Sequence, residues 1–288
     1  MPELPEVETV MKGLEKTIKG QIISNVLINR PNLRWPFPNR MKVRLEGKLI
    51  LNITRRSKYI LIDLSSNETM IMHLGMSGRV LIQDSGKTLG HSTFHLDQGN
   101  LDKHDHVIFT LENGTIVIYN DPRRFGFFQL IENKNALNER FKHLGPEPFD
   151  KKFNLNYVMS FFKDKNKEIK SFLLDQRFVS GIGNIYASEI LFLSKIDPFK
   201  QAKLLTKNEC KKIILNSKKI LHRAIIKGGS SIRNFQDISG TLGGYQKEFK
   251  VYQQEGNGCK AIGCLGIIKK KIMSVSYTHL RAHETLRY

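Results

Sequence analysis

Cysteines, long apolar runs and acidic side chains are all scarce in this chain of 288 residues. Its three cysteines, Cys210, Cys259 and Cys264, are too few for a disulfide framework and fit a reducing cytoplasm. No apolar run reaches the ~18 residues that a membrane-spanning helix needs. No basic stretch followed by an apolar core opens the chain. The sequence therefore predicts neither a membrane protein nor a secretory signal.

Positive charge is what the sequence has in excess. Lys and Arg number 46 against 27 Asp and Glu, which gives a formal net charge of +19. This excess favours a polyanionic partner, either nucleic acid or an acidic membrane surface. A basic surface kept for solubility is the alternative. The hydrophobic content of 40% is enough for one large domain or two smaller ones, each with a core.

Periodic patterns divide the chain into a β-rich part and a helical part. Val10, Leu14 and Ile18 recur every four residues and predict a helix over 7–18 that Gly20 ends. Asn113-Gly114 predicts a hairpin, and 84–103 reads as a long loop. Short runs rich in β-branched residues predict an antiparallel sandwich with strands at 49–53, 59–64, 70–74, 79–83, 106–111 and 115–120.

A polar stretch with Gly and Pro at 132–152 is predicted to be an interdomain linker. After it the pattern becomes helical, with Thr206 and Glu209 forming a capping box for a helix that ends at Gly228-Gly229. Shorter helices are expected at 155–162, 168–174 and 185–193. The expected fold class is therefore α+β, a β-sandwich followed by a helical domain.

The first eight residues, MPELPEVE, combine a proline with carboxylates. If Met1 is removed, Pro2 carries a free secondary amine, and an unperturbed α-amine has a pKa of about 7.7–8.0. A neutral amine can attack a sugar C1′ and form an iminium, and Glu3 lies next to it and could move protons. The alternative is that proline and glutamate here merely open a helix.

Four further motifs place chemically useful side chains between predicted elements. Lys58 lies in RRSKY, Met76 in the glycine turn HLGMSGR, Arg123 and Phe125 in DPRRFG, and Asn184 after the glycines of GIGNIYASE. Cations and amides at a helix N-terminus bind phosphate, and apolar wedges suit an enzyme that extrudes a base. Each motif also has an ordinary structural interpretation: solvated charge, a buried Met, a core Phe or tight glycine packing.

The His-x-His pair in KHDH, His104 and His106, suggests a metal site only weakly. Alternation along a strand places both rings on one side. A structural, hydrogen-bonded histidine is the favoured interpretation.

These motifs, in this order, resemble those of the formamidopyrimidine-DNA glycosylases, bacterial base-excision enzymes for oxidised purines. The resemblance runs from Met1 to about Glu255. It implies a bifunctional DNA glycosylase/AP lyase that removes 8-oxoguanine and formamidopyrimidines from duplex DNA, through a Schiff base on Pro2 and β,δ-elimination. The PELPE start favours this purine branch over the related endonuclease VIII subfamily, which typically begins PEGPE.

The resemblance also implies a role for each motif residue. Pro2, Glu3 and Lys58 would be catalytic, and Met76, Arg123 and Phe125 would intercalate where the base leaves. His104, Arg123, Asn184 and, on a less specific match, Lys170 would contact the DNA. The glycine-rich stretch 228–245 would cap the flipped base. The partner would be double-stranded DNA with an oxidised purine or an abasic site, bound by a monomer in the cytoplasm and associated with the nucleoid.

The domains implied are a catalytic β-sandwich over 1–131, the linker 132–152 and a helix–two-turn–helix domain over 153–244. A zinc-finger hairpin with two CxxC pairs should follow. Here Cys259 fits the first ligand, but Cys264 makes the spacing CxxxxC and no second pair follows. Two thiolates do not close a tetrahedral zinc site, so the expected zinc ion is in doubt. The finger arginine has no counterpart, 245–273 is expected to be a remnant, and 274–288 a foreign tail.

Two functions of other classes remain open at this point. A non-catalytic damaged-DNA-binding protein with the same fold would explain the incomplete finger, although it would have no need of a free N-terminal proline. A basic ribosome- or RNA-associated protein would leave the N-terminus unexplained.

Overall fold

The computed structural model describes residues 1–83, 103–230, 243–273 and 276–281. The chain divides into two compact units, the first made of Met1–Lys142 with Lys227–Gly244 and the second of His143–Ile226 with Tyr245–Tyr288. Nearly all of the predicted loop at 84–103, and most of the predicted cap at 228–245, lie outside the described residues. No helix in the described ranges combines the length and apolar character needed to cross a bilayer.

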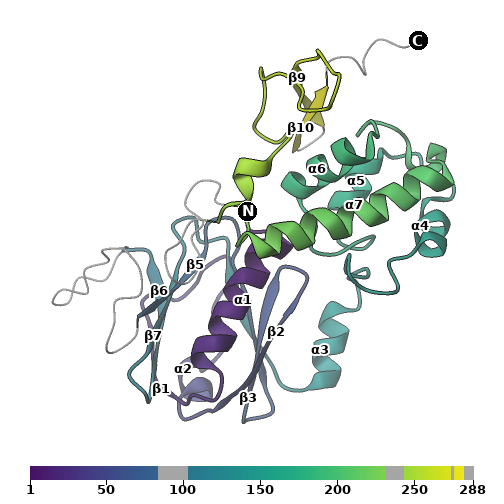
Figure 1. The fold of residues 1–288 in the computed structure, drawn as a ribbon. Coiled ribbons are helices and arrows are strands. Elements are labelled where there is room, and N and C mark those ends of the chain that lie inside the picture. The colour runs from purple at the N-terminus through teal and green to yellow at the C-terminus, as the bar shows by residue number, and fades with distance from the viewer. Residues whose placement is uncertain (84–102, 231–242, 274–275, 282–288) are drawn as a thin grey trace. The chain divides into compact units, whose positions relative to one another are not determined.

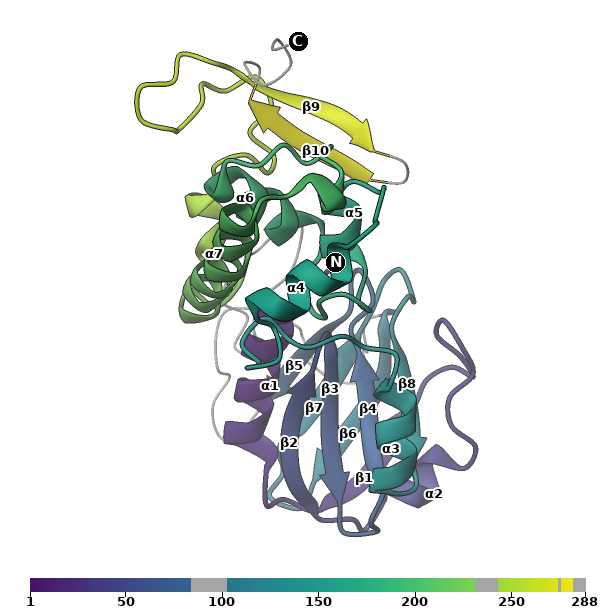
Figure 2. The same cartoon turned by 90° about the vertical axis from the view of Figure 1, so that its right-hand side faces the viewer.

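Two four-stranded antiparallel sheets form the body of the first unit, as the strand pattern predicts (Figures 1 and 2). One sheet has the order β1-β6-β7-β5 and the other β2-β3-β4-β8. The turn at Asn113-Gly114 joins β6 to β7 as predicted, with Gly114 at φ +83°. The strands are β1 Ile23–Ile28, β2 Ile50–Arg56, β3 Tyr59–Leu64, β4 Thr69–His73, β5 Arg79–Gln83, β6 Asp105–Leu111, β7 Ile116–Asn120 and β8 Phe127–Ile131.

Strands β1 and β8 were not predicted individually. The register of β1 against β6 shifts between Ile23 and Asn25, which breaks the alternation of buried and exposed residues that marks a strand. Strand β8 follows Gly126 directly and buries only Phe127 and Phe128, so its apolar pattern is too short to distinguish.

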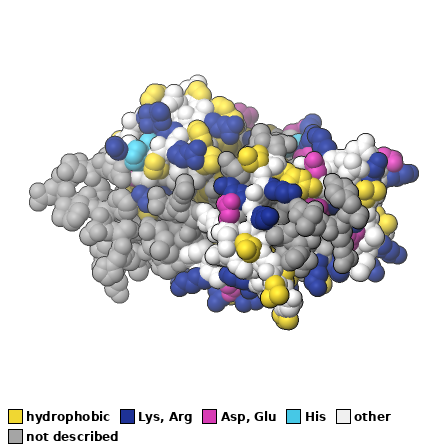
Figure 3. Space-filling view, turned by 90° about the horizontal axis from the view of Figure 1, so that it is seen from above, with side chains coloured by type: hydrophobic (Ala, Val, Ile, Leu, Met, Phe, Trp, Pro, Cys, Tyr) yellow, Lys and Arg dark blue, Asp and Glu magenta, His cyan; other side chains and the backbone are white. Residues whose placement is uncertain are grey.

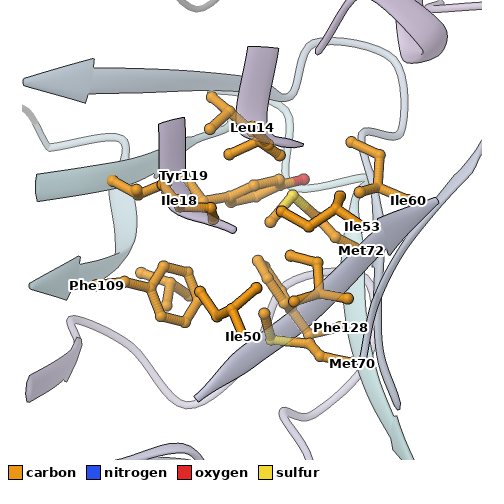
Figure 4. Packing of buried hydrophobic residues seen from close by; sticks show 14 of the residues in the cluster. Leu14, Ile18, Ile50, Ile53, Ile60, Met70, Met72, Phe109, Tyr119 and Phe128 are labelled. Carbon is orange, nitrogen blue, oxygen red and sulfur yellow. The ribbon is translucent and has the colours of Figure 1, made fainter. Parts of the chain in front are cut away.

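Helix α1 (Leu4–Ile18) begins three residues earlier than its apolar period predicts. Its first turn is buried and is held by a hydrogen bond from the Glu3 N–H to the Glu6 Oε2, 2.9 Å long. Farther along, Leu14 and Ile18 enter the core between the sheets (Figure 4). The core also contains Tyr119 and residues from both sheets, including Ile53, Ile60, Met72, Phe109 and Phe128.

Two other helices complete the first unit, α2 (Met41–Leu45) and α3 (Lys134–Phe141). Helix α3 lies within the segment predicted as a linker. Its only buried residue is Phe141, whose ring packs 5.2 Å from that of Tyr59. With one buried apolar side chain, α3 leaves almost no helical period in the sequence.

The second unit holds the helices predicted after the linker. They are α4 (Leu155–Phe162), α5 (Ile169–Leu174), α6 (Asn184–Ser194) and α7 (Lys207–Ile226), with 3₁₀ turns η1 (Ala202–Leu204) and η2 (Tyr245–Glu248). The capping box is confirmed, since the Thr206 N–H donates to Glu209 at 2.7 Å and the Glu209 N–H donates to Thr206 Oγ1 at 3.2 Å. A hairpin of β9 (Ile268–Met273) and β10 (Ser276–Arg281) ends the described chain.

Candidate active site

The N-terminal residues are buried against the rest of the first unit rather than free in solvent. Pro2 and Glu3 are buried, and Met1 is half exposed. Glu6 connects this segment to a distant one: its Oε1 accepts hydrogen bonds from the N–H and the hydroxyl of Ser230, at 2.7 and 2.8 Å. The sequence marks Glu6 as one of the early carboxylates but does not reveal this contact, which spans 224 positions.

The α-amine at this terminus lies among four charged side chains. Burial lowers the pKa of the Met1 amine below its ordinary value of 8.0, and the positive charges of Lys58 and Arg123 lower it further. Glu3 and Glu6 act in the opposite direction. The structure therefore brings Glu3, Lys58 and Arg123, predicted from three separate motifs, to the same amine.

Lys58 is placed by a tight turn between β2 and β3. Residues Ser57 and Lys58 form the turn, and Ser57 has φ +56°. Arg55 holds the turn against α1, because its Nη1 donates to the Ser57 carbonyl at 2.8 Å and its Nε donates to Glu8 at 2.7 Å. Lys58 itself is buried, and this burial lowers the pKa of its ammonium although Glu3 and Glu6 oppose the shift. A lysine of lowered pKa exchanges protons more readily near neutral pH.

Three predicted intercalating residues surround one open pocket in the first unit. The side chains of Met76 and Phe125 are 42% and 41% exposed, as wedges must be. The Arg123 guanidinium stacks over the Phe125 ring at 4.8 Å. The pocket has a volume of about 620 Å³ and is lined by Met1, Leu33, Arg34, His73, Gly75, Met76, Arg123, Arg124 and Phe125.

His73 belongs to this pocket although the sequence gave it no role. Its ring stacks on Phe127 at 4.9 Å, and its Nδ1 accepts the Gly75 N–H at 3.0 Å, so its proton lies on Nε2. Burial, helped by the cations Lys58, Arg34 and Arg140, lowers the pKa of His73 to about 4. His73 is therefore a neutral donor at physiological pH. Its position in the HLGMSGR motif beside Met76 was the one available signal.

The two histidines of KHDH lie on the same side of β6, with ring centroids 6.4 Å apart. His106 is buried, and its Nε2 lies 2.9 Å from the Asp121 carbonyl. His104 is only partly buried, and its carbonyl accepts the Asp121 N–H at 3.0 Å. His106 thus has a structural hydrogen bond, and the predicted contact of His104 with DNA stays a prediction.

In the second unit, Asn184 begins helix α6 after a fixed glycine turn. Gly181 has φ +98°, which only glycine adopts readily. Gln176 holds the turn by accepting the Gly181 N–H at 2.7 Å and donating to the Ile182 carbonyl at 2.9 Å. The Asn184 Oδ1 is buried without a hydrogen-bond partner among the described residues.

Lys170 does not match its expected role in phosphate contact. Its side chain is 0% exposed in helix α5. An ammonium closed off from solvent in this way presents no charge at the surface for a phosphate. The expectation rested on a weakly specific EIK segment, and burial of a lysine in a short helix leaves no sequence signal.

The cysteines do not complete a metal site within the described residues. Cys210 is buried in α7, whereas Cys259 and Cys264 belong to a turn in which the Cys259 N–H donates to the Gly266 carbonyl and the Gly266 N–H donates to Cys264 Sγ. No group of three or more His, Cys, Asp or Glu side chains in the described ranges could hold an ion. The described residues therefore do not fit a four-coordinate zinc.

Comparison with known proteins identifies the family. A family model of the formamidopyrimidine-DNA glycosylase N-terminal domain matches residues 1–128, and a model of the H2TH domain of the same enzymes matches 144–236. The chain belongs to the formamidopyrimidine-DNA glycosylase family. This confirms the resemblance inferred from the motifs.

Relatives in this family match nearly the whole chain. Formamidopyrimidine-DNA glycosylase of Ruegeria sp. (strain TM1040) is 45% identical over 271 residues, which cover 94% of each chain. That of Roseobacter denitrificans is 46% identical over 275 residues, covering 95% of this chain and 96% of its own. Matches of this length extend past Glu255, so the limit inferred from the motifs was too short. The glycosylase sequence continues into the C-terminal hairpin.

Solved structures of the family share the fold. The Lactococcus lactis enzyme in complex with DNA containing an abasic site aligns with a TM-score of 0.85 at 34% identity, covering 97% of both chains. MutM in complex with DNA containing carbocyclic 8-oxo-G aligns with a TM-score of 0.84 at 35% identity, again covering 97% of both chains. The α+β fold class is thereby confirmed.

Proposed function

We propose that this protein is a DNA glycosylase with AP lyase activity that excises oxidised purines from duplex DNA in base-excision repair. The observation that carries this proposal is the cluster at the N-terminus, where an amine of lowered pKa lies among Glu3, Lys58 and Arg123. Family membership and the DNA complexes of the related L. lactis enzyme and MutM support the same activity. On the described surface, Lys and Arg side chains outnumber Asp and Glu (Figure 3), which suits a polyanionic partner.

The chemistry begins when removal of Met1 frees the secondary amine of Pro2. The neutral amine attacks C1′ of the damaged nucleotide, the bond from C1′ to the base breaks, and the base leaves with a proton. Glu3, buried beside the amine, supplies a proton to the sugar O4′ as the ring opens to an iminium. Loss of a C2′ proton then expels the 3′ phosphate. Lys58 assists this β-elimination, and δ-elimination follows.

The wedge and the phosphate contacts hold the duplex during this chemistry. Met76, Arg123 and Phe125 occupy the space that the extruded purine leaves, with Arg123 facing the orphaned base. His104 and Asn184 bind the DNA backbone, Asn184 at the positive end of helix α6. The protein works as a monomer at the nucleoid, and zinc is not assigned a step, because the described cysteines do not complete its site.

A product assay on a duplex with one 8-oxoguanine opposite cytosine tests this function. Wild-type protein without Met1 should release the base and cut the strand. Lys58→Ala should slow strand cleavage by on the order of a hundredfold, the usual contribution of a positioned proton donor. The exposed Lys19, which pairs with Glu15 on α1, provides a control, and Lys19→Ala should leave the rate unchanged. Tight, salt-sensitive binding without release of the base would instead identify a damaged-DNA-binding protein.

A further inference from the structure

Asp121 is a fully buried carboxylate that joins the two segments carrying the wedge residues. Its Oδ1 accepts the Ser77 hydroxyl at 2.5 Å, and its Oδ2 accepts the Gly126 N–H at 2.8 Å. The Tyr119 hydroxyl lies 3.5 Å from the same Oδ2. A buried charge is stable only when such donors satisfy it. These contacts connect the 74–78 turn to the 121–126 loop.

Ser77 extends this connection to Arg123. While its hydroxyl donates to Asp121, its Oγ accepts the Arg123 N–H at 3.1 Å. Met76 precedes Ser77 in the chain, and Phe125 precedes Gly126, whose N–H binds Asp121. One carboxylate therefore fixes the backbone next to all three wedge residues.

Close packing makes the same two segments a single body. A Cβ added to Gly75 would lie 2.3 Å from the Phe125 carbonyl carbon, and one added to Gly126 would lie 1.6 Å from the Tyr119 hydroxyl. That hydroxyl donates to the His73 carbonyl at 3.1 Å, at the start of the turn. Burial beside Asp121 raises the pKa of Tyr119 well above 10.0, so the hydroxyl keeps its proton.

We propose that Asp121 is a positioning residue that holds Met76, Arg123 and Phe125 as one preassembled wedge before DNA binds. This inference rests on the proposed function. Side chains that are already ordered lose little conformational entropy when they replace a base in the stack. Without Asp121, the turn and the loop must be ordered during base extrusion. The penalty should fall on the step in which the damaged base leaves the helix, and much less on the chemistry at Pro2.

Asp121→Asn tests this division of labour, because the amide NH₂ replaces one of two acceptor oxygens and leaves either Ser77 or Gly126 without its partner. Rates are measured in single turnover on a duplex with 8-oxoguanine and on the same duplex with a preformed abasic site. The abasic sugar has no base to extrude. Ser77→Ala removes a single link of the same network. Asp63→Asn is the matched control, since Asp63 accepts only the Thr69 hydroxyl at 2.7 Å, away from the pocket.

Asp121→Asn should slow excision of 8-oxoguanine by on the order of tenfold, the effect of one lost hydrogen bond to a charged group. Cleavage at the abasic site should change by less than about threefold, and Ser77→Ala should act in the same direction with a smaller effect. Asp63→Asn should change neither rate. A stopped-flow signal from 2-aminopurine beside the lesion should show slower wedge insertion in Asp121→Asn.

Equal losses on the two duplexes, or no loss on either, would overturn the inference while leaving the proposed function standing. If Asp121→Asn does not fold, the comparison of Ser77→Ala with wild type decides in the same way. Wild-type protein that cleaves neither duplex would overturn the proposed function and this inference with it.

Discussion

At the scale of single residues, the environment of the N-terminal amine determines whether it can react. An amine attacks a sugar only when neutral, and a protein must therefore lower its pKa toward the working pH. Burial and the charges of Lys58 and Arg123 lower the pKa of the terminal amine, against Glu3 and Glu6. The positive end of the α1 dipole acts in the same direction.

This argument predicts the pH dependence of covalent trapping. Removal of Met1 opens the Pro2 amine among the same charges, so the rate of Schiff-base formation should rise with pH and reach half its maximum below the ordinary 8.0. Glu6→Gln should move that midpoint to still lower pH, because it removes a negative charge that raises the pKa. The measurement is borohydride trapping on an abasic duplex across the pH range. A midpoint at or above 8.0 would contradict the argument.

Motifs identified the residues with local signatures, and the structure supplied those that act over long distances. Pro2, Lys58 and Arg123 could be named from the sequence because each lies in a short, specific pattern. Glu6 and Asp121 could not, because their partners Ser230 and Ser77 lie far away in the chain. Burial of Lys170 likewise follows from packing that no local pattern encodes.

At the scale of elements, one buried glutamate ties the C-terminal segment to helix α6. Glu189 Oε1 accepts three successive backbone N–H groups, of Lys250, Val251 and Tyr252, at 3.1, 3.0 and 2.8 Å. Burial raises the pKa of this carboxyl even though those hydrogen bonds oppose the shift. The approach to the β9–β10 hairpin is thus held by α6 without any contribution from a metal.

Glu189→Ala should lower the free energy of unfolding by about 3 kcal/mol or more, because three buried backbone donors lose their acceptor. Glu189→Gln keeps one oxygen and should cost only about 1 kcal/mol. Urea unfolding of both variants measures the difference, and limited proteolysis after residue 250 should be faster in the alanine variant alone. Equal stabilities for the two variants would show that the anchor is not needed.

Elements with a regular period or a capping signal could be predicted, and irregular ones could not. Helix α7 has a capping box and a continuous apolar face, and the structure contains both. Helix α3 buries one residue and β1 contains a register shift, so neither leaves a clear period. The hairpin pairs β9 with β10 across the predicted start of the foreign tail, and the origin of 274–288 stays a prediction.

At the scale of the whole molecule, the chemistry and its supports are divided between the two units. The amine, Lys58 and the wedge belong to the first unit, and Asn184, the cysteines and the hairpin belong to the second. Because the reacting groups lie together in the first unit, the formation of a covalent intermediate should not depend on a complete set of zinc ligands. An incomplete finger should weaken the hold on DNA more than the chemistry of Pro2.

The central claim is that Pro2 is the nucleophile, and trapping followed by peptide mapping tests it most directly. Protein processed at Met1 is reduced with borohydride on a duplex with 8-oxoguanine opposite cytosine, digested, and analysed by mass spectrometry. The account predicts a DNA adduct on the N-terminal peptide at Pro2, and its loss or strong reduction in Pro2→Gly. An adduct on Lys58, or salt-sensitive binding with no adduct on any residue, would contradict it.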